Sequence, residues 1–221
     1  MITRIFDVCV ALIGLIVTAP LLLFAAIGIL VSSRGPVFYQ AARIGKDAKP
    51  FRMIKFRTMR VVAGGPVITA GRDPRIFWFG NLLRKTKIDE LPQLVNVLIG
   101  QMALVGPRPE APEIVQSAYT DWMMETLRVR PGVTSPGSLY YYATAEDQIA
   151  QDDPETHYIN DVMPQKLAID RAYLERRTFA RDLGVLLRTA KTIALLLAGR
   201  PVAINETDVQ SAMPWHQLAR H

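Results

Sequence analysis

The feature that most constrains this chain is a run of 24 residues without a charged side chain, from Val8 to Val31. About 20 apolar residues are enough for a helix to cross the hydrocarbon core of a bilayer. The run also exceeds the apolar part of a cleaved signal peptide, which covers about 7–15 residues. We therefore expect this segment to be a helix in contact with a lipid bilayer.

Pro20 stands within this run, where it removes one helical hydrogen bond and bends the helix. Two topologies satisfy the preference of Lys and Arg for the cytoplasmic side. In one, a straight helix spans the membrane and leaves the short N-terminus outside. In the other, the helix is kinked at Pro20, re-enters, and keeps Arg4 and Arg34 at the same cytoplasmic surface. The residues alone leave both topologies open.

Charge is distributed unevenly along the 221 residues, which suffice for one domain with a real core. The net charge is +6, yet residues 32–87 alone hold 13 Lys or Arg and 2 acidic residues, a local balance of +11. A basic block directly after an apolar segment suits an anionic membrane surface, a phosphate-rich ligand, or both. The single cysteine, Cys9, excludes a disulfide within the chain and fits a reducing compartment.

An acidic pair, Asp89–Glu90, lies among basic side chains and directly precedes a helical pattern. The pattern is the apolar spacing i, i+3, i+4 and i+7, carried by Leu91, Leu94, Val95 and Leu98. Because Pro92 is tolerated only in a first turn, we expect the helix to begin close to Asp89. The positive end of the helix dipole would then keep this carboxylate ionised. A simple helix cap is the alternative role for Asp89.

Basic side chains near the pair are candidates for binding phosphate. Lys55 lies in the predicted strand 51–56 and Arg57 directly follows it, and both are expected to point the same way, because side chains alternate along a strand. Arg84 precedes the pair, and Arg108 stands between Pro107 and Pro109, which fix the backbone on both sides. A guanidinium held in this way can bind phosphate through two parallel hydrogen bonds.

The remaining pattern predicts short strands and several helices. The expected strands are 36–40 and 51–56, joined by a turn at Gly45, and 102–105. The expected helices are 73–83 with Asp73 as its cap, 109–127, 161–177 and 182–199. Residues beyond Pro201 carry no clear pattern.

Six short motifs resemble, in order, those of the bacterial sugar transferases, specifically the small monotopic phosphoglycosyl transferases. They are Lys55–Met59, Leu83–Thr86, Asp89–Leu94, Asn96–Leu98, Val105–Pro109 and Arg130–Thr134. The resemblance implies an α+β fold associated with the membrane, with a kinked re-entrant helix followed by short strands and amphipathic helices. The implied divisions are a membrane hairpin at 1–33, a cytosolic catalytic domain at 34–200 and a C-terminal tail at 201–221.

The resemblance also implies an activity and a site. A sugar-1-phosphate would pass from a UDP-sugar to polyprenyl (undecaprenyl) phosphate, with Mg²⁺ as cofactor, at the cytoplasmic face of the bacterial inner membrane. Asp89 and Glu90 would be the catalytic residues and would help to hold the metal. Lys55, Arg57, Arg84, Arg108 and Arg130 would bind phosphate or nucleotide. Assembly as a homodimer is compatible with this scheme.

The proposed chemistry needs no histidine, and the three in this chain lie far in sequence from the motifs. An Asp with a pKa near its ordinary value of about 3.9 is already anionic at neutral pH. We therefore expect Asp89 to attack phosphorus directly and to form a covalent intermediate. Two unit negative charges about 4 Å apart repel by roughly 4 kcal/mol at an effective dielectric of 20, so nearby cations are required.

One segment departs from the commonest pattern of the family and leaves the sugar undefined. Residues 135–142 read Ser-Pro-Gly-Ser-Leu-Tyr-Tyr-Tyr, where the family more often resembles Gly-Leu-Ala-Gln. The rival interpretation of the chain is a non-catalytic scaffold that binds anionic lipid through its basic block. Nucleic-acid binding is disfavoured, because the basic residues lack interleaved aromatic platforms.

Overall fold

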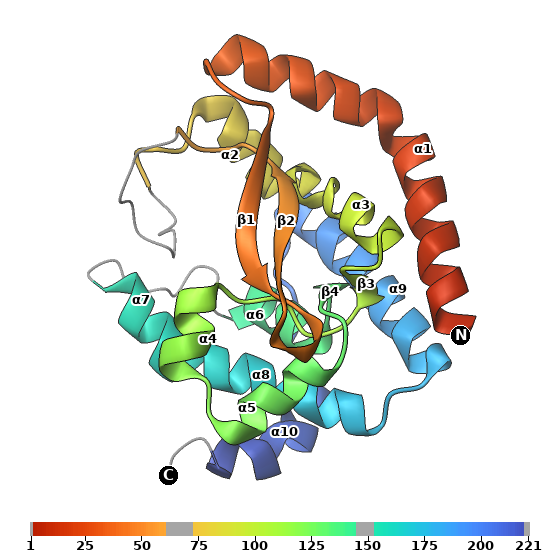
Figure 1. Cartoon of the computed structure of the whole chain (residues 1–221), viewed down its shortest axis with the longest axis vertical. Helices are drawn as coiled ribbons and strands as arrows, with labels where there is room; N and C mark the ends of the chain where they lie inside the picture. The colour runs from red at the N-terminus through yellow and green to blue at the C-terminus, as the bar shows by residue number, and fades with distance from the viewer. Residues whose placement is uncertain (1, 61–72, 145–152, 219–221) are drawn as a thin grey trace.

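The computed structural model describes residues 2–60, 73–144 and 153–218 and is a mixture of helices and short strands. Its first element, α1 (Ile2–Ser32), is one helix that contains Pro20. Figure 1 shows α1 bent between its two halves and wrapped over one side of the remaining elements. Among the described residues it is the one helix long and apolar enough to cross a membrane. The structure therefore agrees with the predicted N-terminal apolar helix.

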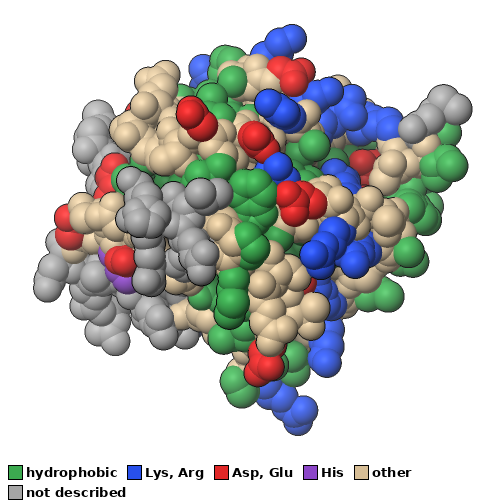
Figure 2. Space-filling view, turned by 90° about the horizontal axis from the view of Figure 1, so that it is seen from below, with side chains coloured by type: hydrophobic (Ala, Val, Ile, Leu, Met, Phe, Trp, Pro, Cys, Tyr) green, Lys and Arg blue, Asp and Glu red, His purple; other side chains and the backbone are tan. Residues whose placement is uncertain are grey.

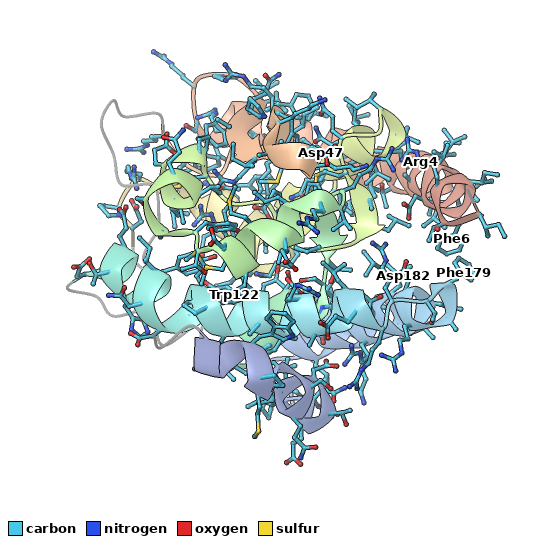
Figure 3. The ribbon with its side chains drawn as sticks, turned by 60° about the horizontal axis from the view of Figure 1, so that its bottom comes forward. Arg4, Phe6, Asp47, Trp122, Phe179 and Asp182 are labelled. Carbon is cyan, nitrogen blue, oxygen red and sulfur yellow. The ribbon has the colours of Figure 1, made fainter. Side chains whose placement is uncertain are left out.

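The N-terminal half of α1 is held by α3 (Gln93–Leu98) and α9 (Phe179–Leu197). The guanidinium of Arg4 donates to the carbonyl oxygens of Val97 and Leu98, at 2.7 and 3.0 Å. The ring of Phe6 meets that of Phe179 edge-on, with 5.0 Å between centroids. Figure 3 shows Phe6 of α1 next to Phe179 of α9. This end of the helix is therefore attached to the domain.

The C-terminal half of α1 packs on α2 (Trp78–Lys85). Ala25 and Ile29 join Phe77 and Phe79 in one buried apolar cluster. A Cβ at Gly28 would lie 2.2 Å from the Phe79 ring, so this close approach of helix and ring requires glycine. Much of the other side of α1 is exposed and apolar, and Figure 2 shows such side chains along the right-hand edge, where α1 lies.

Two strands after α1 form the predicted hairpin, with different bounds. β1 (Phe38–Ile44) pairs antiparallel with β2 (Pro50–Phe56), and the short 3₁₀ turn η1 (Lys46–Ala48) connects them. The expected turn at Gly45 is confirmed, since its N–H donates to the Lys49 carbonyl at 2.8 Å. The first strand lies two to four residues later than predicted. Residues 36 and 37 precede the ladder, which begins with Phe38 opposite Phe56.

The predicted buried strand at 102–105 is confirmed as β3 (Ala103–Val105), which pairs in parallel with β4 (Gly132–Thr134). The backbones of Gly106, directly after β3, and Gly132, the first residue of β4, approach each other closely. A Cβ on Gly132 would lie 2.2 Å from the Gly106 nitrogen, so glycine is required here too. Around β3 lies the largest apolar cluster, which includes Met53, Val97, Met102 and Val185. These contacts fix the loop that follows β3.

Two helix predictions in the middle of the chain are wrong. Asp73 does not cap α2; it accepts hydrogen bonds from Arg75, and the helix begins only at Trp78. The single helix expected at 109–127 is three short pieces: α4 (Pro112–Ala118), α5 (Asp121–Met124) and the 3₁₀ turn η3 (Glu125–Arg128). Tyr119 and Thr120 have extended backbones between α4 and α5, and this break turns the chain around the core.

Helices form the rest of the described chain. They are α6 (Pro136–Thr144), α7 (Pro154–His157), the π-helical turn η4 (Tyr158–Val162), α8 (Met163–Glu175), α9 and α10 (Glu206–Leu218). The helices predicted at 161–177 and 182–199 correspond to α8 and α9, although α9 begins three residues earlier, capped by Thr178. The tail at 201–221 contains α10, which packs on α8 through Ala212.

Candidate functional site

The acidic pair lies in a 3₁₀ turn, η2 (Ile88–Glu90), that precedes α3. Lys87 begins this turn with a left-handed backbone, φ 55°. The helix itself begins at Gln93, so the expectation that it starts at Asp89 is wrong by about one turn. Asp89 makes no capping hydrogen bond, because it stands inside the turn and not at the residue before the helix. The simple cap is therefore excluded as its role.

A polar cavity of about 270 Å³ opens beside Glu90, whereas Asp89 lies buried behind it and is not among the lining residues. The basic lining residues of the cavity come from β1, β2, the stretch of α2 and η2, the loop after β3, and α8, and they are Arg43, Lys55, Arg84, Lys87, Arg108 and Lys166. Glu90 and Glu110 supply acidic groups, and Tyr141, Tyr142 and Tyr158 supply rings. A larger cavity of about 430 Å³ lies between α6, α9 and the start of α10, and neither member of the acidic pair lines it. The smaller cavity, which Glu90 and the basic side chains line, is therefore the candidate active site.

Glu90 is paired with two cations at this cavity. Its Oε1 accepts a hydrogen bond from Lys55 Nζ at 3.2 Å and another from Arg108 Nη2. Burial opposes ionisation of this carboxyl, but Arg108 and Lys55 outweigh it and hold the pKa of Glu90 well below its usual range. Glu90 is therefore a permanent anion, and it fixes the positions of two cations that face the cavity.

Asp89 has a different environment, although it is adjacent. Its residue is only 8% exposed, and Oδ1 is enclosed without a hydrogen-bond partner among the described residues. Burial, together with the charge of Glu90, raises the pKa of Asp89 to about 6, against the pull of Lys55, Arg84 and Lys87. The expected pKa near 3.9 is thus wrong. The carboxyl still loses its proton below neutral pH, and it is less stabilised as an anion than an exposed Asp, which favours reaction at phosphorus.

Three of the predicted phosphate-binding residues line the cavity: Lys55, Arg84 and Arg108. Arg84 is anchored by a hydrogen bond from Nε to Thr58 Oγ1 at 2.9 Å. Arg108 Nη1 also lies 3.5 Å from the Val133 carbonyl oxygen. The side-chain partners of Lys55, Arg84 and Arg108 include one acidic residue, Glu90, so these three cations together retain excess positive charge.

The structure places the other two predicted residues elsewhere. Arg57 is buried and donates to Ser33 and to the Pro36 carbonyl, which ties the end of α1 to β2. Its partners are Ser33 and Pro36, whereas Lys55 is paired with Glu90, so the two side chains do not act on one site. Arg130 is exposed and donates to the Gly100 carbonyl at 2.9 Å. Neither lines the cavity.

The far wall of the cavity contains residues that the sequence pattern did not reveal. Glu110 Oε1 accepts hydrogen bonds from Tyr158 and Lys166, both at 2.5 Å. Tyr158 opens the π-helical turn, a local distortion that is frequent at functional sites. Glu110 is 48 positions from Tyr158 and 56 from Lys166, so no local sequence motif could indicate these contacts. The adjacent Pro109 was the only signal in the sequence.

Residues 135–142, which depart from the common family pattern, form the start of α6 and line part of the cavity. Ser138, Tyr141 and Tyr142 face it. Asp170 of α8 holds this helix, since its carboxylate accepts from the Gly137 N–H at 2.8 Å and from the Ser135 hydroxyl at 3.0 Å. Burial raises the pKa of Asp170 to about 7. The family-variable segment is therefore part of the site.

Comparison with known proteins now adds to this geometry. The sequence profile described as bacterial sugar transferase matches residues 1–195. The chain belongs to the bacterial sugar transferase family. A Caulobacter vibrioides UDP-glucose:undecaprenyl-phosphate glucose-1-phosphate transferase is 36% identical over 199 residues, 86% of this chain and 68% of that protein.

Two further relatives match a shorter part of this sugar transferase, and one of them has a different name. A Bacillus subtilis protein is 44% identical over 133 residues, 59% of this chain and 74% of that protein. It is named a putative undecaprenyl-phosphate N-acetylgalactosaminyl 1-phosphate transferase. An Escherichia coli UDP-glucose:undecaprenyl-phosphate glucose-1-phosphate transferase is 40% identical over 133 residues, 58% of this chain and 28% of that protein. The named sugars thus differ among relatives of similar identity.

The acidic pair also fits a divalent cation. Mg²⁺ prefers oxygen ligands and is commonly held by one or two carboxylates together with substrate phosphates. Glu90 uses only Oε1 in its hydrogen bonds with protein groups, which leaves Oε2 for an ion, and Asp89 supplies a second carboxylate next to it in the chain. The described residues contain no group of three or more His, Cys, Asp or Glu that could hold a metal. The donor set therefore suits an ion that is shared with the substrate.

Proposed function

We propose that this sugar transferase moves a sugar-1-phosphate from a UDP-sugar to undecaprenyl phosphate, with UMP as the other product. The observation that carries the proposal is the buried pair in which Glu90 is paired with cations and Asp89 is not. The names of the relatives support the same two substrates.

In the first step, Asp89 acts as the nucleophile. A carboxylate oxygen attacks the phosphorus that bears the sugar, and the bond from this phosphorus to the bridging oxygen of UMP breaks. UMP leaves with the electron pair, and the sugar phosphate remains on Asp89. Lys55, Arg84 and Lys87 act on the Asp89 carboxylate and also line the cavity, so they can reduce the repulsion between it and the diphosphate.

In the second step, an oxygen of undecaprenyl phosphate attacks the same phosphorus. The bond between phosphorus and the Asp89 oxygen breaks, and the free carboxylate is restored. The product is a polyprenyl-diphospho-sugar. Neither step requires a general base, because both attacking groups are already anions near neutral pH.

Glu90 and Asp89 would hold Mg²⁺ together with the substrate phosphates, with Glu90 as the carboxylate that lines the cavity. The ion would supply additional positive charge near the transferred phosphoryl group. Arg108 stays fixed by Glu90 throughout and presents its guanidinium to the same space. Arg84 is held in a comparable way by Thr58.

The proposed membrane arrangement is a re-entrant α1 whose two ends lie at the cytoplasmic face. The N-terminal end is attached through Arg4 to carbonyls of α3, and the C-terminal end through Ser33 to Arg57. Both attachments are to the same domain. The exposed apolar side of α1 would then lie in one leaflet, and the cavity would be close to lipid-borne acceptors.

A labelling experiment tests the covalent step. The purified full chain in detergent is incubated with a UDP-sugar that is ³²P-labelled in the phosphate next to the sugar, in the absence of acceptor. We expect label on the wild-type protein and release of UMP, and neither with Asp89→Asn. Asp121→Asn, which changes an exposed carboxylate, serves as the matched control and should behave like wild type.

The negative outcomes are informative as well. UMP release that depends on acceptor, with no labelled protein, would indicate direct transfer in a ternary complex. Absence of UMP release with every UDP-sugar tested, acceptor included, would favour a lipid-binding scaffold.

A further inference from the structure

A second buried polar side chain near Asp89 has no partner. Gln93 is fully buried, and neither Oε1 nor Nε2 has a hydrogen-bond partner in the part of the chain that the structure describes. A buried amide without hydrogen bonds costs stability, about 1–3 kcal/mol for each group. Native proteins rarely retain such a group without a use for it.

The contrast with Asn96 shows that the surroundings of α3 can satisfy an amide. Asn96 is equally buried, on the same helix, and it makes three hydrogen bonds. Its Oδ1 accepts from the Ile54 N–H, and its Nδ2 donates to the Arg52 carbonyl and to Gln101 Oε1. Asn96 therefore stabilises the packing of α3 on β2. Gln93 does not contribute in this way.

The position of Gln93 relates it to Asp89. The two residues are four apart, and the backbone between them is helical, with Leu91 and Pro92 both in the right-handed region. The N–H groups of Leu91, Leu94 and Val95 donate to carbonyls three residues earlier, so this segment is wound more tightly than an α-helix. Helical side chains lean toward the N-terminus, so the long side chain of Gln93 can reach back toward Asp89. The enclosed oxygen of Asp89, Oδ1, also has no partner among the described residues. A donor and an acceptor without partners therefore stand four residues apart on one right-handed coil.

Other donors near Asp89 already have partners. Lys55 of β2 donates to Glu90, and Arg84 of α2 donates to Thr58 and Met59. Lys87 of the same turn lies over the ring of Tyr142, at 4.2 Å. The amide of Gln93 can thus turn toward Asp89 without breaking a hydrogen bond of its own.

We propose that Gln93 is a positioning residue for the nucleophile: its Nε2 donates to Asp89 Oδ1 and directs Oδ2 toward the substrate phosphorus. The inference rests on the proposed function of Asp89. Two consequences follow. The same oxygen attacks in every turnover, and the bond to the carbonyl oxygen remains available while the sugar phosphate is attached.

The test compares variants that separate donation from packing. Gln93→Met keeps the length of the side chain and removes both polar atoms. Gln93→Glu keeps the shape and the acceptor but removes the amide donor. The measurements are the rate and amplitude of the UMP burst at saturating UDP-sugar, the KM for UDP-sugar, and the melting temperature. Burst amplitude reports the active fraction, whereas burst rate reports the chemical step.

For Gln93→Met we expect a burst rate lower by roughly tenfold to a hundredfold, the effect of one hydrogen bond to a charged group. KM should change little, and the melting temperature should stay the same or rise, because an unsatisfied amide has been removed. Gln93→Glu should be at least as slow. Asn96→Leu provides the control for packing, and its melting temperature should fall.

Two results would overturn the inference. One is a Gln93→Met variant with a normal burst rate and a lower melting temperature, which would make Gln93 a packing residue. The other is a normal burst rate for Gln93→Glu, which would show that the donor is not needed. Failure of the wild-type protein to give any burst would instead contradict the proposed function itself.

Discussion

Single residues divide the predicted phosphate-binding side chains into two groups that composition could not distinguish. Arg57 and Arg108 both stand in family-like motifs, yet one binds the end of α1 and the other lines the cavity. The position of Arg108 between two prolines was a local signal and could be used from the sequence. The partners of Arg57 are Ser33 and Pro36, more than 20 residues away, and they became visible only in the folded chain.

This division gives the first prediction. Arg108→Ala should lower turnover by roughly tenfold to over a hundredfold, since one charge-assisted contact contributes about 1.5–3 kcal/mol. Arg130→Ala should change turnover by less than about threefold, because Arg130 is exposed and outside the cavity. Steady-state rates of UMP release for both variants provide the measurement. Equal, small losses would make Arg108 a turn residue only.

The protonation of Asp89 is a second property at this scale that sequence could not provide. The residue type and the neighbouring cations suggested a readily ionised carboxyl, whereas burial raises its pKa to about 6. Burial depends on how η2 packs against the neighbouring α2 and against β2, and β2 comes from a distant part of the chain. The residue that we propose as the nucleophile could therefore be singled out from the sequence, whereas its electrostatic state could not.

At the scale of elements, local patterns predicted well where packing was regular. Apolar periodicity found α9 and the buried strand β3, while the break at Tyr119 and Thr120 had no comparable signal. The cavity depends on α6, whose start is held by Asp170 of α8 across 33 to 35 residues. Through these hydrogen bonds, the ionisable carboxyl group of Asp170 holds α6, the helix whose sequence departs from the common family pattern.

The second prediction concerns this attachment. Burial raises the pKa of Asp170 to about 7, above its value of about 3.9 in an unfolded chain. The native state therefore binds more protons between pH 4 and 7, and this group lowers the free energy of unfolding as pH rises through that window. Asp170→Asn cannot ionise and keeps an acceptor oxygen. Its stability relative to wild type should rise from about pH 4 to 7 by a few kcal/mol and then level off.

Melting temperatures of both proteins from pH 4 to 8 check this prediction. In a chain of this size, 1 kcal/mol corresponds to roughly 2–4 °C, so the expected difference is measurable. Parallel curves at all pH values would show that Asp170 does not titrate in this range. All other titrating groups are the same in wild type and Asp170→Asn, so their contributions cancel in the difference between the two melting curves.

At the scale of the whole molecule, α1 and the domain form one unit. A straight helix of 31 residues is about 46 Å long, which exceeds the roughly 30 Å hydrocarbon core. If α1 spanned the bilayer, Arg4 would lie on the opposite side from the α3 carbonyls to which it donates. The sequence left the span and the hairpin equally open, because the loop charges satisfy both. The contacts at the two ends of α1 favour the hairpin.

The third prediction follows from these contacts. In a Cys9→Ser background, single cysteines are introduced by Ile2→Cys, at the exposed start of α1, and by Lys46→Cys, in the exposed turn between β1 and β2. A maleimide that cannot cross membranes is added to intact spheroplasts and, separately, to permeabilised ones. A re-entrant helix predicts no labelling of either cysteine in intact cells and labelling of both after permeabilisation. Labelling of Ile2→Cys alone in intact cells would establish a single span, and labelling of both would place the domain outside the cytoplasm.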